Sequence, residues 1–345
     1  MTGSKPGSSP GSARVGRSEG FAFGLRFDLR RAPFASVSAA DQYRQCVEMA
    51  RWADARGCGA ISLSEHHGVD FVSAPVPLAG VLLGATRNTR VDITALLLPL
   101  HDPVRLAESI ATLDLASGGR FRIVAGLGYR REEFAMAGVD RAARGRLADE
   151  HLDVLLRAFT GESFEWRGRA VRVTPTPASP AASLVAVGGA SPQSIERAAR
   201  LRLPFSTMST DPSVRTAYHA ACVALGYEGV FHAPSGPSFV HVAEDPERAW
   251  AEIAPYARYD AVSFARWQGR ASAHPAVSEA TTDAELRATG LWAVVTPAEC
   301  VQLVREHGTV KLHPLMGGMA PELGWSSLEL FVDQVLPVVM VREDP

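Results

Sequence analysis

Short apolar segments alternate with helix-like segments along most of this chain. The segments at 60–64 and 91–98 are apolar over most of their length, instead of alternating regularly between apolar and polar residues. Strands of this kind are buried on both faces, which is typical of a parallel sheet covered by helices. The alternation therefore predicts an α/β fold assembled from repeated strand–helix units.

Eight strand–helix pairs can be counted. The expected strands are 21–28, 60–64, 91–98, 120–125, 184–187, 203–208, 238–243 and 309–313. The expected helices are 39–56, 75–87, 103–117, 146–159, 191–201, 212–224, 246–258 and 325–338. A doubly wound sheet usually has fewer strands and a glycine-rich first turn, whereas eight pairs match a (β/α)₈ TIM barrel. We therefore expect a TIM barrel.

Three segments fall outside this pattern. Residues 1–20 are rich in Gly, Ser and Pro, so we expect a disordered leader before a single domain at 21–345. Residues 161–183 have the character of a hairpin with a Pro-rich stretch. Residues 259–296 are polar and irregular, and they precede the helix that Pro297 begins. Insertions of this length are often lids, so we expect a lid near the C-terminal strands.

Composition favours a soluble protein of enzyme size. Hydrophobic residues make up 46% and charged residues 21%, and the formal net charge is -2. This balance supplies a large core but no field that would attract nucleic acid or a membrane surface. Cys46, Cys58, Cys222 and Cys300 lack CxxC spacing, which argues against disulfides and favours the cytoplasm. No run reaches the roughly 18 apolar residues of a membrane span.

The segment ISLSEHH at 61–67 ends in three titratable side chains, Glu65, His66 and His67. Active sites of TIM barrels lie at the carboxyl ends of the strands, so this segment predicts chemistry. Paired histidines in a loop can also be structural. Neighbouring residues of an extended segment point to opposite sides, so only one of the two can face a common metal ion. The chain has no HxH or HExxH pattern either, and we expect no metal site.

Two further strand ends carry candidate ligand-binding residues. They are His101 after the 91–98 strand, and Gly126, Gly128, Tyr129 and Arg130 after the 120–125 strand. The two glycines would let the backbone approach a flat ring or a phosphate closely. A tyrosine can cover such a ring, and an arginine can pair with the phosphate. Arg130 also begins a charged run that is typical of a solvated helix start.

A fourth strand end has the pattern of a phosphate site. Gly188 and Gly189 follow the 184–187 strand, and Ser191 and Ser194 begin the next helix. Backbone N–H groups at a helix N-terminus, together with serine hydroxyls, suit a phosphate dianion. The same residues also fit a simple helix cap.

These pieces together resemble the bacterial luciferase-like monooxygenase family. The similar motifs are SEHH at 64–67, LLLPLHDPVRLAESIATLDLASGGRF at 96–121, GLGYRREEFAMAGVD at 126–140 and LHPLMGGMAPELGWSSLELF at 312–331. The resemblance covers nearly the whole chain after the leader. It implies a TIM barrel that uses a flavin or a deazaflavin, and dimers formed through the helices at 75–87 and 104–117.

The resemblance also implies roles for particular residues. His66 would be a base or proton shuttle, with Glu65 beside it as a second candidate catalytic residue. A non-prolyl cis peptide between Thr94 and Ala95 would lie beside the flavin ring. Ser191 and Ser194 would hold the flavin phosphate, and the residues expected near the substrate or the lid are His67, His101, Phe71 and Trp267.

Two departures from the family pattern affect the choice of cofactor. Leu127 stands where the luciferase phosphate loop has an arginine, so another residue such as Arg130 would have to meet the phosphate charge. Ala190 replaces a glutamate. We expect a monooxygenase that uses reduced FMN, supplied by a separate flavin reductase, and O₂ on a small organic substrate. The alternatives are a reductase or dehydrogenase dependent on coenzyme F420, and a flavin-binding protein without turnover.

Overall fold

The computed structural model describes residues 22–268, 280 and 282–340. The leader expected at 1–20 lies outside these described residues. The hairpin expected within 161–183 is present, as the antiparallel pair β5 (Phe164–Trp166) and β6 (Arg169–Val171).

The main sheet has ten strands, and every pairing in it is parallel. Its order is β11 (Trp292–Val295), β10 (Phe239–Val242), β12 (Val310–Leu312), β1 (Phe23–Phe27), β2 (Ala60–Leu63), β3 (Arg90–Leu97), β4 (Phe121–Gly126), β7 (Val185–Gly188), β8 (Phe205–Ser206) and β9 (Phe231–His232). The first strand of the chain pairs with the last, β12, as the closing of a barrel requires. The predicted α/β barrel class is confirmed, although β9 and β11 were not expected.

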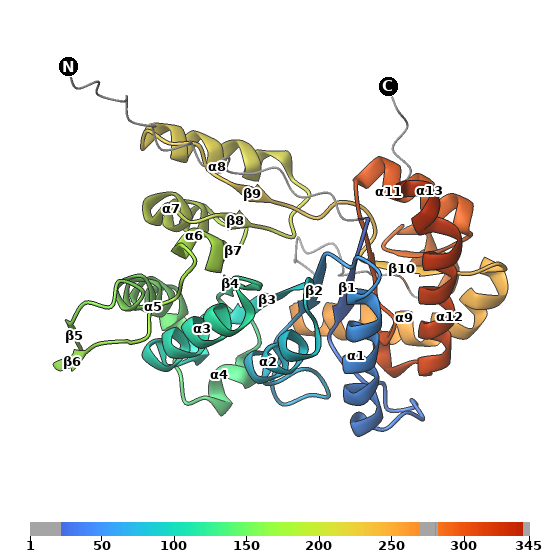
Figure 1. Ribbon diagram of the computed structural model, residues 1–345, viewed down its shortest axis with the longest axis horizontal. Helices are drawn as coiled ribbons and strands as arrows, with labels where there is room; N and C mark the ends of the chain where they lie inside the picture. The colour runs from blue at the N-terminus through green and yellow to red at the C-terminus, as the bar shows by residue number, and fades with distance from the viewer. Residues whose placement is uncertain (1–21, 269–279, 281, 341–345) are drawn as a thin grey trace, which may run out of the picture.

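Helices follow most strands and cover the outside of the sheet (Figure 1). The longer ones are α1 (Ala39–Asp54), α2 (Pro75–Ala85), α3 (Pro103–Ser117), α5 (Arg144–Ala158), α7 (Pro192–Leu201), α8 (Pro212–Ala224), α9 (Pro246–Gln268), α11 (Pro297–His307) and α12 (Pro321–Leu330). The short ones are α4 (Arg131–Met136), α6 (Ala181–Leu184), α10 (Asp283–Ala288) and α13 (Leu336–Met340). Side-chain caps fix where several of these helices begin. For example, the Asp102 carboxylate accepts from two backbone N–H groups in the first turn of α3, as expected.

The secondary structure expected for 259–296 is wrong. Helix α9 continues to Gln268, α10 occupies 283–288, and β11 joins the sheet. The polar composition made the apolar helical spacing of this segment hard to recognise. In the structure, Ala257, Ala261 and Phe264 follow that spacing and are buried on one side of α9. Residues 269–279 and 281 lie outside the described residues, and the lid itself stays a prediction.

The hydrophobic core lies between the sheet and the helices. In β1, Phe23, Leu25 and Phe27 are fully buried in it, at every second position. The intervening residues of the strands point to the inner side of the sheet, and many of them are polar: Arg26, Ser62, Asp92, Thr94 and Arg122. This inner surface therefore differs from the layers of branched apolar side chains that usually fill a TIM barrel.

The last helix was expected at 325–338 and is longer. Helix α12 runs through one π-helical turn (Phe331–Val335) into α13. Over Pro321–Met340 its 20 residues, with a mean hydropathy of 1.2, are by length and composition sufficient to cross a membrane. Leu328, Phe331 and Val335 of this helix are fully buried in the main core, and a core helix explains the composition.

Candidate active site

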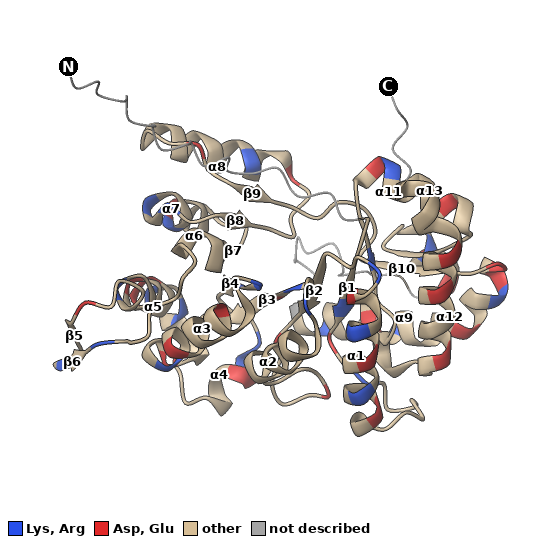
Figure 2. Cartoon of the chain, viewed as in Figure 1, with Lys and Arg blue, Asp and Glu red and all other residues tan. Residues whose placement is uncertain are grey.

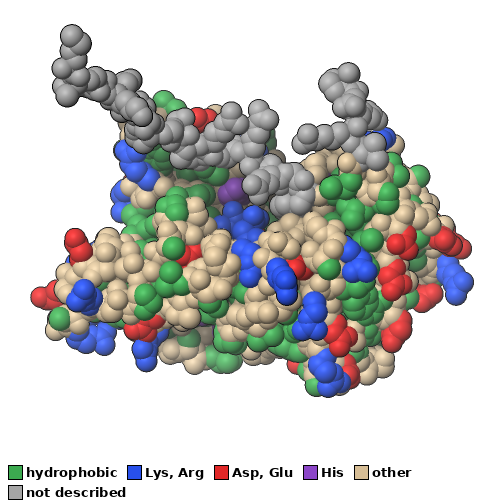
Figure 3. Space-filling view, in the orientation of Figure 1, with side chains coloured by type: hydrophobic (Ala, Val, Ile, Leu, Met, Phe, Trp, Pro, Cys, Tyr) green, Lys and Arg blue, Asp and Glu red, His purple; other side chains and the backbone are tan. Residues whose placement is uncertain are grey.

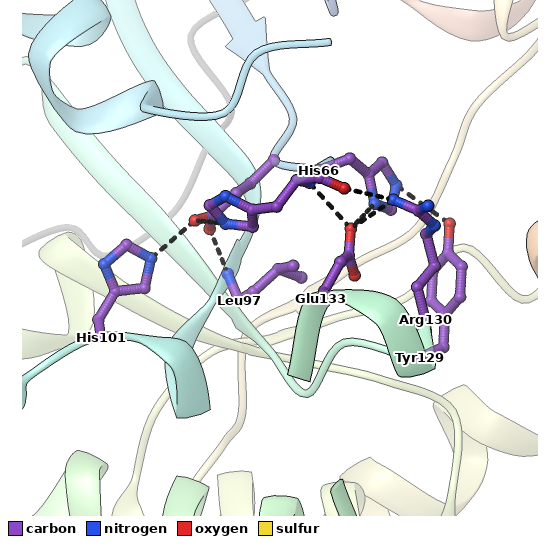
Figure 4. A network of polar contacts seen from close by, with 8 residues as sticks. His66, Leu97, His101, Tyr129, Arg130 and Glu133 are labelled. Carbon is purple, nitrogen blue, oxygen red and sulfur yellow. Dashed lines mark hydrogen bonds and ion pairs between the residues drawn. The ribbon is translucent and has the colours of Figure 1, made fainter. Parts of the chain in front are cut away.

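The side chains singled out from the sequence converge where β2, β3 and β4 end (Figure 4). Two buried carboxylates organise this region. Glu65 follows β2, and Glu133 lies on the short helix α4 after β4. Each carboxylate binds one of the two adjacent histidines, so His66 and His67 have different surroundings.

Glu65 links the ends of β2 and β3. Its Oε1 lies 2.9 Å from His67 Nε2 and 2.8 Å from His101 Nε2, and its Oε2 accepts from the Leu97 N–H at 2.6 Å. Burial opposes ionisation of this carboxyl, but the hydrogen bonds from His101 and His67 outweigh burial and lower its pKa to about 2. Glu65 is therefore an ionised carboxylate whose two oxygens are both occupied by protein donors.

Glu133 holds His66 in one orientation. Its Oε1 lies 2.7 Å from His66 Nδ1, and it also accepts from the His67 backbone N–H at 3.1 Å and from Arg130 Nη1 at 3.2 Å. A carboxylate is an acceptor only, so His66 Nδ1 carries the proton in this contact. The other ring nitrogen, Nε2, then accepts from the Tyr129 hydroxyl at 3.1 Å.

Their surroundings keep His66 neutral and Glu133 ionised. Burial is the main cause that lowers the pKa of His66, with Arg30 and Arg130 adding to it and Glu133 partly opposing it. Burial also opposes ionisation of Glu133, but its hydrogen bond with His66 outweighs this and lowers its pKa. A neutral imidazole whose Nδ1–H is bound to a carboxylate is arranged to accept a proton at Nε2.

Aromatic rings enclose His66. The centroids of Phe71, Trp267 and Tyr129 lie 4.8, 4.9 and 5.4 Å from that of His66. Trp267 contacts two guanidinium groups, with the Cζ atoms of Arg30 and Arg130 at 4.6 and 4.8 Å from its ring. The structure thus places both aromatic residues predicted from the sequence, Phe71 and Trp267, beside His66.

The peptide bond between Thr94 and Ala95 is cis, as the resemblance implied. Glycines let the neighbouring strands approach here. A Cβ on Gly126 would lie 2.8 Å from the Cβ of Ala95, and one on Gly188 would lie 2.9 Å from Cγ1 of Val124. Gly128 has a φ of 72°, in the left-handed region that favours glycine. These glycines are needed for the backbone packing that surrounds the cis peptide.

A separate cavity of about 580 Å³ lies at the N-terminus of α7. Ser191 lines this cavity and caps the helix by accepting from the Ser194 N–H. Ser194 is buried, and its hydroxyl donates to the Ser191 carbonyl at 2.7 Å. Gly189 is required beside it, because a Cβ there would lie 2.6 Å from Ser194 Oγ. Of the two serines predicted to hold a phosphate, only Ser191 faces the cavity.

Arg130 does not lie at this cavity, which corrects the expectation that it could meet a phosphate there. Its Nη1 donates to the His67 carbonyl at 2.6 Å and to Glu133. Arg144 lines the cavity instead, and among the described residues its guanidinium pairs with no carboxylate and donates only to the Arg141 carbonyl. Arg197 and Arg200 also line the cavity, but both pair with Asp149.

Sequence reasoning missed Glu133 and Arg144. Glu133 ends an Arg-Arg-Glu-Glu run that is typical of a solvated helix start. Its role becomes visible only in the structure, where the residue is 1% exposed. Arg144 begins a helix in an arginine-rich segment, where no motif distinguishes it from Arg141 or Arg146.

Comparison with known proteins extends this picture. The alkanal monooxygenase alpha chain of Photorhabdus laumondii subsp. laumondii is 29% identical over 174 residues, which are 48% of this chain and 48% of that relative. The 4-hydroxyprotoasukamycin monooxygenase of Streptomyces nodosus subsp. asukaensis is 31% identical over 118 residues, 34% of this chain and 32% of that relative. The chain thus matches about half or less of the length of these curated relatives.

Solved structures share the fold over nearly the whole chain. The monooxygenase RslO1 from Streptomyces bottropensis has a TM-score of 0.75 at 21% identity, covering 92% of this chain and 99% of that one. The oxygenating constituent of 3,6-diketocamphane monooxygenase from Pseudomonas putida, in complex with FMN, has a TM-score of 0.69 at 19% identity. The match covers 93% of this chain and 99% of that one. An F420-dependent secondary alcohol dehydrogenase has a TM-score of 0.67 at 13% identity, and the match covers 92% of this chain and 99% of that one.

A sequence profile described as luciferase-like monooxygenase matches residues 25–310. This match begins in β1, ends at the first residue of β12 and includes every residue of the network around Glu65 and Glu133. The chain therefore belongs to the luciferase-like monooxygenase family.

Proposed function

We propose that this protein is a flavin-dependent monooxygenase that uses reduced FMN and O₂ to oxygenate a small organic substrate. The observation that carries the proposal is the relay of partly buried Tyr129 and buried His66 and Glu133 at the end of the barrel strands. Family membership and the names of the relatives support the reaction class. Reduced FMN would come from a separate flavin reductase, as in two-component systems.

The flavin phosphate would occupy the cavity at the N-terminus of α7. There it would meet the Ser191 hydroxyl, the backbone N–H groups of the helix and the Arg144 guanidinium, which has no carboxylate partner among the described residues. The ring would lie near the Thr94–Ala95 peptide. When bound, the reduced flavin supplies the electrons that activate dioxygen.

The protein's own groups would handle protons and exclude water. His66 would accept a proton at Nε2, exchanging it with Tyr129, while Glu133 stabilises the imidazolium that forms. Phe71 and Trp267 would keep water from the reacting atoms. Glu65 was predicted to be catalytic. Since protein donors occupy both of its oxygens, we assign it a positioning role, in which it fixes His67, His101 and Leu97.

A second candidate function is hydride transfer with coenzyme F420. The cavity beside Ser191 has three arginine side chains, Arg144, Arg197 and Arg200. Arg197 and Arg200 pair with Asp149, but with Arg144 they place several donors around the cavity, which would suit the phosphodiester and acidic tail of a deazaflavin as well as the monoester of FMN.

Anaerobic titration with reduced FMN and with reduced F420, followed by fluorescence, separates the two candidates. We expect FMN to bind more tightly and the complex to consume O₂ faster when substrate is present. His66→Gln should keep FMN affinity and slow turnover, whereas the exposed control Glu132→Gln should change neither. Preference for F420 with activity in the absence of O₂ would support hydride transfer, and binding without any turnover of a substrate panel would support a flavin-binding role.

We also propose a homodimer formed through α2 and α3. Val81 of α2 and Leu115 of α3 are 53% and 44% exposed, although both are large and apolar. Light scattering coupled to size-exclusion chromatography should give twice the mass of the chain, and Val81→Glu should shift it to that of one chain. A single-chain mass for the unmodified protein would contradict this assignment.

A further inference from the structure

The inner surface of the sheet carries charged side chains on its central strands. Arg90 and Asp92 belong to β3, Arg122 to β4, Lys311 to β12 and Arg26 to β1. Each alternates with residues buried in the main core, so these side chains point away from the covering helices. Figure 2 shows blue segments on the central strands, and most of the red on the surrounding helices.

Part of this charge is internally paired. Asp92 accepts from Arg90 Nε at 2.9 Å and from Arg90 Nη2 at 3.2 Å on one side, and from Arg122 Nη2 at 3.0 Å on the other. Burial opposes ionisation of Asp92, but Arg122 and Arg90 outweigh burial and lower its pKa. One carboxylate thus holds two guanidinium groups in place and leaves one positive charge in excess.

The remaining cations increase the excess. Arg26 Nη2 reaches Asp28 Oδ2 only at 3.8 Å, and Asp28 also faces His313. The backbone of Lys311 pairs with β1, but among the residues that the structure describes its ammonium group has no hydrogen bond or ion pair. The Nε atoms of Arg26 and Arg122 are buried, and neither has a hydrogen-bond acceptor among the described residues. Four cations therefore face two carboxylates, which leaves two positive charges in excess.

Lys311 experiences this imbalance directly. Surrounding protein lowers the pKa of its ammonium group, and repulsion from Arg26 and Arg122 lowers it further, with Asp92 opposing. Lys311 is nevertheless accessible to solvent. Figure 3 shows Lys or Arg and His side chains together in a hollow between the elements β9 and β3. His232 of β9 is near enough to this cluster for the charges of Arg122 and Asp92 to affect its pKa, which places the cluster at the hollow. Like charges held in this way destabilise a fold unless an anion compensates them.

We propose that this recess, lined by Arg26, Arg122 and Lys311, is a binding site for a small dianion of the phosphate or sulphate class. The two excess charges match a dianion. The Arg26 and Arg122 side chains are 17% and 22% exposed, so their guanidinium groups, together with the exposed Lys311 ammonium group, supply donors. The site differs from the Ser191 cavity. None of Arg26, Arg122 and Lys311 lines that cavity. Arg122 also lies four residues before Gly126, the last residue of β4, which is roughly 13 Å along a strand.

A purely structural role explains only part of the cluster. Arg90, Asp92 and Arg122 form an ion-pair network that would brace β3 against β4 without any ligand. Lys311 adds no pairing to that network and is repelled by it. A structural role therefore predicts that Lys311 is dispensable, whereas an anion site requires its charge.

The test uses selenate as a dianion that anomalous diffraction can locate, and sulphate for calorimetry. In crystals soaked with selenate we expect a peak between Arg26, Arg122 and Lys311. In solution, Lys311→Met should weaken sulphate binding by roughly tenfold or more, because a charge-assisted contact is lost. Without anion, the thermal stability of Lys311→Met should equal or exceed that of the parent, since repulsion is relieved.

Two controls separate this site from the cofactor cavity. Arg144→Gln removes an arginine from the cavity beside Ser191 and should leave the recess intact, while Arg146→Met removes an exposed arginine of α5 that lines neither. Both should retain the sulphate affinity that Lys311→Met loses. Selenate found only at Ser191 or on the outer surface, or equal sulphate affinity for Lys311→Met and the parent, would overturn the proposal.

Discussion

Replacing Glu133 by Gln tests whether this carboxylate controls His66. The change removes one negative charge from a side chain that is 1% exposed, and it keeps the size and one acceptor oxygen. Its hydrogen bond and its charge are the two causes that raise the pKa of His66 against burial. Exchanging a charge-assisted contact for a neutral one removes about 1 to 1.5 kcal/mol of stabilisation of the imidazolium, so the pKa of His66 should fall.

The same substitution should also lower stability. Arg130 is buried, and it would keep the His67 carbonyl and the Trp267 ring but lose its carboxylate partner. Leaving such a cation unpaired should cost about 2 to 4 kcal/mol in the free energy of unfolding. Because the pKa of Glu133 is lowered by folding, its contribution is present above the pKa of the unfolded chain and is lost as the pH falls through the folded value. The difference in the free energy of unfolding between Glu133→Gln and the parent should therefore become smaller at acidic pH.

NMR titration of the His66 ring and urea unfolding at two pH values measure both effects. Glu132→Gln is the matched control, since Glu132 is the preceding residue of α4 and is exposed. It should leave the pKa of His66 and the stability unchanged. A His66 pKa that stays constant or rises in Glu133→Gln would refute the reasoning, because burial and the two arginines would then account for His66 without Glu133.

Two further substitutions test the cavity and the strand packing. Arg144→Gln should weaken FMN binding by roughly tenfold or more and leave riboflavin binding unchanged, since riboflavin lacks the phosphate; fluorescence titration with both ligands checks this, and equal loss for both would contradict it. Gly188→Ala places a Cβ 2.9 Å from Cγ1 of Val124 and should destabilise the fold by about 1 to 3 kcal/mol in urea, whereas the uncrowded control Gly84→Ala should not destabilise it.

Most of the fold could be predicted from the sequence because the apolar periods are strong. The expected helix at 103–117 coincides with α3, and the strands around Leu25, Ile61 and Ile123 lie within a few residues of their expected bounds. Strand β9 was missed because two residues carry no period, and α9 was cut short because buried Asp260 and Ser263 gave its later turns a polar composition.

The candidate site was predictable only where local patterns mark it. The SEHH segment and the glycines follow strands, so their position at the barrel end could be inferred. Glu133 binds His66 across 67 positions of sequence, and Arg144 reaches the cavity of Ser191 across 47. Such long-range pairings depend on how helices pack on the sheet, which no local period encodes.

The two adjacent histidines provide the last test of the assigned roles. Burial lowers the pKa of His66. The pKa of His67 is raised, mainly by the hydrogen bond between His67 and Glu65. At a pH near the ordinary histidine value, His66 should therefore be neutral and His67 charged, which suits a base beside a structural cation. Proton-detected NMR should show His67 losing its proton at higher pH than His66. Removing the Glu65 charge by Glu65→Gln should lower the pKa of His67 and leave that of His66 unchanged, because the partner of His66 is Glu133. If His66 titrated above His67, the base would have to be assigned elsewhere.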